Sequence, residues 1–206
     1  YGSYLIPAVM MIIIFQTLLM VIGMVTGEEY SSDGIRTYAP FGHTWAAAIR
    51  IVAGKAFVYC GLYAIFSFFL LGLLPYFFSI PNIGNGLYIV LLMIPYLIAT
   101  SFLGLAASRY FTDSEAPLLM IAFFSVGLIF LSGVSYPMEL MPWYWKAAHY
   151  ILPAAPATLA FVQLNSMGAS MADIRPEYIT LWIQVLVYFI LSIWVYQKKL
   201  QKSQLR

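Results

Sequence analysis

Long stretches without a charged residue constrain this chain more than any other feature of its sequence. Asp, Glu, Lys and Arg are absent from residues 1–27, 56–108, 116–138, 147–172 and 178–197. A helix that crosses a bilayer needs about 20 apolar residues, so four of these runs are long enough to span directly. Charged residues make up 9% of the chain, against roughly 25% in an average globular protein. The sequence therefore predicts a membrane protein.

Two of the runs contain breaks that shape the predicted fold. FFSIPNIGNG, at 77–86, supplies turn residues and divides the run 56–108 into two helices with a tight loop. Pro153 and Pro156 leave no good 20-residue helix in 147–172, so this run predicts short helices in, or dipping into, the membrane interface. We expect an all-α membrane protein with one domain over 1–206 and five transmembrane helices, at 4–27, 56–78, 87–109, 115–135 and 177–197. Thr44 is the expected N-cap of a helix that continues into the second of these spans.

The basic residues predict the orientation. If residues 28–55 are cytoplasmic, only Lys146 and Arg175 lie outside. Eight of the ten basic residues then lie inside: Arg36, Arg50, Lys55, Arg109, Lys198, Lys199, Lys202 and Arg206. By the positive-inside rule the chain starts outside and ends in the cytoplasm, on an odd number of spans. We expect at least one further helix to precede Tyr1 in the full protein.

Several kinds of catalytic site are not indicated. The Gly54-Lys55 pair is followed by Ala56 and has Ile49 at the position of the first phosphate-loop glycine, so no ATP hydrolysis is expected on this chain. His43 and His149 fall on opposite sides of the membrane, and no metal site is expected. Cys60 is the single cysteine and is expected to serve packing.

The predicted spans contain no ionisable group away from their ends, which argues against an ion-coupled carrier. Their deepest polar residues are Gln16, Thr17, Ser125, Ser132, Gln184 and Ser192. Such groups either make hydrogen bonds between helices or line a path for an amphiphilic substrate.

Charge is crowded into the segment VTGEEYSSDGIRTYAP, at 25–40, directly after the first span. Glu28 and Glu29 are poorly placed as caps, because the dipole at a helix C-terminus disfavours anions. The segment is either a solvated loop or a docking surface for a cytoplasmic partner.

Two parts of the sequence resemble the membrane subunit of type-2 ATP-binding-cassette exporters, the ABC-2 type permeases. The first is an apolar span that ends in paired acids, followed by Gly34, Pro40 and the Gly54-Lys55 pair. The second is FLSGVSYPMELMPWYWKAAHYILPAAPATLAF, at 130–161, which is similar to the family's Ser-Gly-Val, Tyr-Pro, Met-Pro-x-Trp and Leu-Pro series. The resemblance covers nearly the whole chain and aligns it with spans two to six of the family.

The resemblance implies a permease that exports an amphiphilic substrate outward across a bacterial inner membrane. Its partners would be a cytoplasmic ATP-binding subunit, a second permease half, identical or not, membrane lipids and, in some envelopes, a periplasmic adaptor; no nucleic acid is expected. ATP would bind the partner subunit, with no cofactor on this chain. The residues implied in coupling to the ATP-binding subunit are Glu28, Glu29, Asp33, Gly34 and Arg36. Those implied in the translocation path, on the spans 4–27 and 115–135, are Gln16, Ser125 and Ser132. The extracellular re-entrant segment would hold Pro137, Pro142, Trp143, Trp145 and Pro153.

The competing class is a polytopic scaffold or an intramembrane lipid-modifying enzyme. A transferase should show a reactive cluster at the interface, and Glu139 with His149 is the only candidate pair. Co-purification with an ATPase would separate the two classes.

Overall fold

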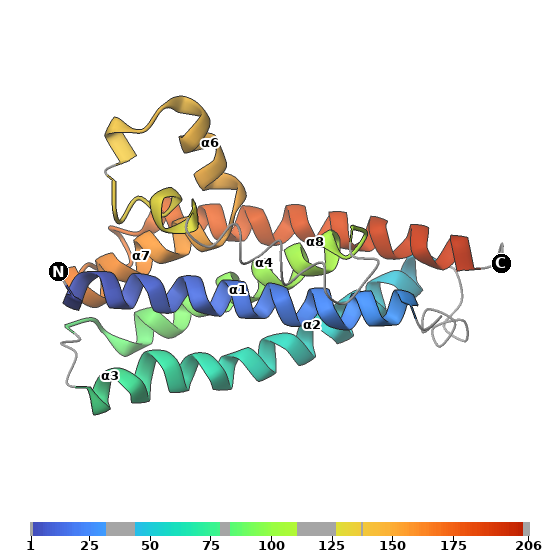
Figure 1. The fold of residues 1–206 in the computed structure, drawn as a ribbon, viewed down its shortest axis with the longest axis horizontal. Helices are drawn as coiled ribbons and strands as arrows, with labels where there is room; N and C mark the ends of the chain where they lie inside the picture. Colours follow the sequence, from blue (N-terminus) through green and yellow to red (C-terminus); the bar gives the residue numbers. More distant parts are fainter. Residues whose placement is uncertain (1, 32–43, 79–82, 111–126, 137, 204–206) are drawn as a thin grey trace.

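The computed structural model describes residues 2–31, 44–78, 83–110, 127–136 and 138–203, and among these residues there is no strand. The helices are α1 (Gly2–Ser31), α2 (Trp45–Phe68), η2 (Phe69–Leu73), α3 (Leu74–Phe77), α4 (Gly86–Ala107), η3 (Met138–Leu140), α6 (Trp143–Ile151), α7 (Ala154–Met167) and α8 (Arg175–Ser203). The long helices α1, α2, α4 and α8 lie along the long axis of the molecule, and α6 projects to one side (Figure 1). The predicted all-α class is confirmed.

Four described segments are long and apolar enough to cross a membrane: Leu5–Glu29, Trp45–Phe77, Gly86–Ala107 and Arg175–Gln201. They match four of the five predicted spans. The fifth prediction, 115–135, lies largely outside the described residues, although 127–131 are helical. If α6 and α7 are counted together as one broken span, the number of candidate spans is five.

The boundaries of the second span differ from the prediction. Its helix begins at Trp45 and continues through the π-helical turn η2 and the short helix α3 to Phe77. Thr44 is its N-cap, as predicted, and its hydroxyl oxygen accepts a hydrogen bond from the Ala47 N–H at 3.3 Å. Because the span starts earlier than residue 56, Lys55 lies inside it. The expectation that ionisable groups occur only at the ends of the spans is therefore wrong for Lys55.

The loop between α3 and α4 ends at a second capped helix start. The Asn85 side chain accepts a hydrogen bond from the Leu87 N–H at 3.0 Å, which supplies a partner for one of the free donors of the first turn. Just before it, the Ile83 N–H donates to the Asn165 carbonyl at 3.1 Å. This bond holds Ile83 against the last turn of α7. Because α3 ends at Phe77 and α4 begins at Gly86, the predicted division of 56–108 into two helices is confirmed.

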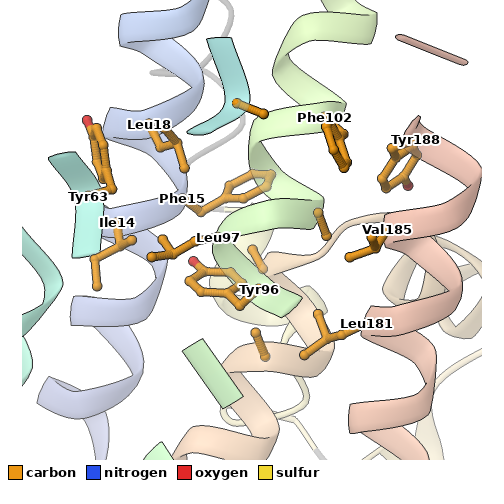
Figure 2. Close-up of a cluster of buried hydrophobic side chains, with 14 of the residues drawn as sticks. Ile14, Phe15, Leu18, Tyr63, Tyr96, Leu97, Phe102, Leu181, Val185 and Tyr188 are labelled. Carbon is orange, nitrogen blue, oxygen red and sulfur yellow. The ribbon is translucent and has the colours of Figure 1, made fainter. Parts of the chain in front are cut away.

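Helix α4 is at the centre of the bundle, because it contacts α1, α2, α7 and α8. Side chains of α1 and α8 converge on it, among them Phe15 and Leu181 (Figure 2). Tyr96 of α4 is fully buried, and its hydroxyl donates to the Met11 carbonyl of α1 at 2.6 Å. Inside a bilayer, close packing and such interhelical hydrogen bonds hold helices together, since the surrounding lipid is as apolar as the core.

Helices α1 and α4 approach closely at Gly104. A Cβ atom on this glycine would lie 2.9 Å from Cδ1 and 3.2 Å from Cβ of Ile22. Small residues at helix contacts in membranes allow this proximity. The glycine is therefore required by the packing of α1.

The bent pair α6 and α7 turns by 87°. Pro153 is the N-cap of α7, and Pro156 lies in its first turn, where a missing N–H costs little. Helix α7 contacts α1, α4 and α8, and most of its residues are buried. The short helices are present as predicted. However, α7 is packed inside the bundle, whereas we expected these helices to lie in, or dip into, the membrane interface.

Candidate functional site: the network at the basic end of the bundle

One end of the bundle carries the C-termini of α1 and α8 and the start of α2 (Figure 1). We call it the basic end, because Lys55, Arg109, Lys198 and Lys199 lie near it. Glu29, close to the end of α1, forms an ion pair with Lys55 of α2, whose Nζ lies 2.7 Å from Oε1 and 2.5 Å from Oε2. The Lys55 and Glu29 side chains are only 13% and 24% exposed. The cation also compensates the unfavourable position of an acid at a helix C-terminus.

Tyr196 of α8 extends the ion pair to a third helix. Its hydroxyl accepts a hydrogen bond from Lys55 Nζ at 3.2 Å, and Lys55 and Lys199 each lie 5.2 Å from the centre of its ring. Two cations therefore flank one aromatic ring, an arrangement that the ring quadrupole stabilises.

Lys199 continues these contacts to the end of α4. Its Nζ donates to the carbonyl oxygen of Ser108 at 3.1 Å and to Oγ of the same residue at 2.9 Å. Ser108 is the C-cap of α4, where a positive charge favours the helix dipole and satisfies a carbonyl that has no helical partner. Glu29, Lys55, Tyr196, Lys199 and Ser108 form what we call the Glu29 network. It joins the C-terminal parts of α1, α8 and α4 to Lys55 in the interior of α2.

Of the five residues predicted to couple to a partner, the structure describes Glu28 and Glu29. Glu28 is exposed, whereas Glu29 points into the bundle and is bound to Lys55. Asp33, Gly34 and Arg36 lie outside the described residues. The structure therefore separates the two neighbouring acids, which the sequence analysis treated as a pair.

The predicted path residues have different environments. Gln16, in the middle of α1, is partly buried, and its side-chain nitrogen is buried without a hydrogen-bond partner in the part of the chain described. Ser132 is fully buried, and its hydroxyl donates to the Ile129 carbonyl at 2.7 Å. Ser125 lies outside the described residues. A buried donor without a partner costs about 1–3 kcal/mol, so Gln16 is the polar group of this set that retains bonding capacity.

An apolar groove of about 510 Å³ lies between α2 and α4 and does not include the predicted path residues. Among its lining residues are Ser67, Phe68 and Gly72 of the α2 span and Val90 and Met93 of α4. Elsewhere on α2 large apolar side chains are exposed, among them Phe57 and Ile65.

Side chains of α8 hold the predicted re-entrant segment at its bend. The Gln184 amide donates to the Tyr150 carbonyl at 2.8 Å, and the Tyr188 hydroxyl donates to the carbonyl of Ile151. These bonds satisfy carbonyls at the end of α6 that have no partner within the helix. Gln184 thus bonds between helices, one of the two roles that the sequence left open for it.

The proline and tryptophan residues of the re-entrant segment are placed as follows. Pro142 and Pro153 are the N-caps of α6 and α7, Trp143 and Trp145 are exposed on α6, and Pro137 lies outside the described residues.

Of the two residues that the enzyme alternative requires, the structure describes only the side chain of His149. His149 is 1% exposed, and its Nδ1–H donates to the Leu131 carbonyl at 2.8 Å, so the ring serves packing. The side chain of Glu139 is outside what the structure describes. No group of His, Cys, Asp and Glu suited to a metal ion occurs among the described residues.

The pairing of Lys55 was not predicted, although the position of this lysine in the sequence indicates it. A lysine eleven positions after the N-cap Thr44 lies well inside a helix whose remaining residues, apart from Arg50, are uncharged. Charged groups within spans almost always have a partner. The nearby candidates were the acids that end the previous span.

Together the fold and the network define a multi-pass all-α membrane protein whose helices are joined at one end by buried charges. The family model described as ABC-2 family transporter protein matches residues 1–194, and the chain belongs to this family. No curated protein and no solved structure matches the chain. The protein is accordingly a membrane permease of an ABC transporter, and its family implies association with an ATP-binding subunit. The predicted resemblance is confirmed.

Proposed function

We propose that this chain is the permease half of an ATP-driven exporter that acts as a dimer and moves an amphiphilic substrate outward. ATP binds and is hydrolysed on separate cytoplasmic subunits, and this chain carries no cofactor. The membrane is a bacterial inner membrane, and the C-terminus is cytoplasmic. Family membership supports the class, and the excess of basic residues at one end of the bundle supports the orientation.

The observation that carries the proposal is the Glu29–Lys55 pair at the point where α1 leads into the charged segment 32–43. In the proposed mechanism the ATP-binding subunit contacts this segment and Glu28, and its closure on ATP displaces the end of α1. The ion pair transmits the displacement to α2, and Tyr196 with Lys199 transmits it to α8 and α4. Four spans therefore respond to a movement at one segment.

The proposed path runs along α1 and the 115–135 span. Such a path has no charge to recognise, so it selects by shape and by a few hydrogen bonds. The Gln16 amide nitrogen is buried here without a partner among the described residues, and in the proposed path its side chain turns outward to donate to a substrate or to the second permease half.

The test is co-purification of the complete complex from its native membrane, followed by ATPase and transport assays. Glu28→Lys should reduce substrate-stimulated ATP hydrolysis while the thermal stability of the permease in detergent stays unchanged, because Glu28 is exposed. Lys146→Glu, also a charge reversal but predicted to lie on the outer side, is the control and should leave coupling intact. Full coupling in Glu28→Lys would contradict the docking role.

A second variant addresses the path. Gln16→Leu should change which compounds are exported more than it changes stability, since it removes a donor that has no protein partner. Thr100→Val is the matched control, because the buried Thr100 hydroxyl already donates to the Tyr96 carbonyl of its own helix. If both variants alter the substrate range equally, the path does not pass Gln16.

A further inference from the structure

Two cations at the basic end share one indole ring and lie outside the Glu29 network. Lys198 Nζ lies 3.7 Å from the centre of the Trp194 ring, and Arg109 Cζ lies 5.7 Å from it. Lys198 is one turn beyond Trp194 on α8, whereas Arg109 directly follows the C-cap of α4. Both cationic side chains are exposed.

Among the described residues, this pair of charges has no counter-ion. In the described ranges no carboxylate is within ion-pair distance of Arg109 or Lys198. At exposed positions a cation over an aromatic ring gains only about 0.5–1 kcal/mol, and the two positive charges repel each other. An anion bound by both side chains would reduce the repulsion between the two cations and be attracted by each of them.

The positions of Arg109 and Lys198 near the ends of their spans indicate the source of the anion. Arg109 lies just past the end of the Gly86–Ala107 span, and Trp194 and Lys198 lie in the last turns of the Arg175–Gln201 span. Tryptophan concentrates at the level of lipid headgroups, and Trp194 is 40% exposed. Basic sites between helices at this level suit the phosphate of an acidic lipid.

An apolar stripe continues from Trp194 along α8 toward the middle of the span. Leu191, Ile190 and Val187 are three, four and seven positions before Trp194, so they share its helical face. Their exposed fractions are 44%, 66% and 47%. A headgroup at the cations would therefore leave its acyl chain lying on an exposed apolar surface, which a soluble anion would not use.

We propose that Arg109, Lys198 and Trp194 bind the headgroup of an anionic phospholipid, whose acyl chain lies along Leu191, Ile190 and Val187. The bound lipid bridges the ends of α4 and α8, next to the contact between Lys199 and Ser108. None of its residues belongs to the proposed substrate path or to the segment proposed to contact the ATP-binding subunit.

The experiment measures lipid retention by native mass spectrometry on the full-length complex in detergent. Phosphatidylglycerol and phosphatidylcholine with identical acyl chains are titrated in parallel, so that only the headgroup charge differs. The wild-type protein should retain phosphatidylglycerol preferentially. Arg109→Gln/Lys198→Gln should weaken that retention by about 10- to 30-fold, the upper value corresponding to ~1 kcal/mol for each basic residue near a membrane surface.

Arg50→Gln/Arg175→Gln is the matched control, since it removes two exposed positive charges that lie at the starts of α2 and α8. It should keep the wild-type preference. Arg109→Lys/Lys198→Arg preserves both charges and should also keep the wild-type preference. This variant distinguishes an effect of the missing charges from misfolding of the glutamine variant. Trp194→Leu should reduce retention of phosphatidylglycerol more than that of phosphatidylcholine.

Four results would overturn the proposal. One is equal retention of phosphatidylglycerol by wild type and the Arg109/Lys198 double variant, and another is an equal loss in the Arg50/Arg175 control. The third is displacement of the lipid by millimolar inorganic phosphate, which would make the pair a site for soluble anions. Loss of the ATP-binding subunit from Arg109→Gln/Lys198→Gln, with lipid retention unchanged, would assign the pair to the protein interface and contradict the lipid site.

Discussion

Replacing Glu29 by Gln removes the carboxylate that pairs with Lys55 and leaves the cation in a largely buried position. The pair has two close contacts, at 2.7 and 2.5 Å, and the side chains are 13% and 24% exposed. Exposed pairs contribute about 0.2–1 kcal/mol, whereas removal of one partner from a buried pair costs about 3–5 kcal/mol. The intermediate burial places the expected loss of stability from Glu29→Gln at roughly 1–3 kcal/mol.

A double-mutant cycle measures the interaction free energy between Glu29 and Lys55 apart from their contacts with other residues. Lys55→Met keeps the volume and the helix propensity of the side chain but leaves Glu29 without its cation. Each single change should cost more than the double change, because the double variant has no unpaired charge. We expect a coupling free energy of about 1–3 kcal/mol, within the range measured for residues in one network.

The assay is reversible unfolding in mixed micelles, followed for the wild type, the two single variants and the double variant at low and high salt. The coupling should persist at high salt, since buried pairs are screened less than exposed ones. Effects that add within about 0.3 kcal/mol would show that the two residues act independently. That result would refute the assignment of the Glu29–Lys55 pair as the link between α1 and α2.

Three further outcomes follow from the packing and from the predicted orientation. Gly104→Ala should lower stability in detergent by about 1–3 kcal/mol, because the new methyl group would overlap Ile22. Gly61→Ala is the control and should be neutral or stabilising, because its methyl group would meet nothing within 4 Å. Equal effects of the two changes would contradict the close approach of α1 and α4. Tyr188→Phe should cost about 1 kcal/mol in the same unfolding assay and increase proteolysis near the bend between α6 and α7, since it removes one of the bonds that hold the end of α6; unaltered proteolysis would argue against the tether. On a cysteine-free background, Ser170→Cys should react with an impermeant thiol reagent in intact cells and Ser203→Cys should not, and the opposite pattern would reverse the proposed orientation.

The spans and their caps could be predicted because they depend on local sequence. Charge-free runs of sufficient length identify membrane helices, and Thr44 marks a helix start by residue type. The end of the first helix and the loop before α4 followed from the same local signals. The start of the second span was placed too late because Lys55 was taken as its boundary, although a paired lysine fits inside a helix.

The contacts between distant residues could not be predicted. Lys55 and Tyr196 are 141 positions apart, and their meeting depends on how α2 and α8 rotate and tilt against α4. Gln184 was recognised as a deep polar residue, but its partner, the Tyr150 carbonyl, is freed only because the chain bends between α6 and α7. Hydrophobic pattern defines which segments enter the membrane and leaves the rotation of each helix open.

The position of α7 could not be predicted either, because it depends on packing against distant parts of the chain. Two prolines and a polar end suggested short helices at the interface, yet both prolines lie at the start of α7, where they do not disturb it. The remaining residues are small or apolar enough to pack against three long helices. Length alone excluded α7 as a span and did not exclude burial within the bundle.

In the proposed mechanism, ATP hydrolysis on a partner drives outward movement of substrate through this permease, with the end of α1 as the point of coupling. Its most direct test is transport of an amphiphilic fluorescent compound into inverted membrane vesicles that contain the complete complex. We predict uptake that requires hydrolysable ATP and that falls severalfold in Glu28→Lys, with ATP binding by the partner subunit retained. Uptake that proceeds equally without ATP, or that is unaffected by Glu28→Lys, would contradict the account.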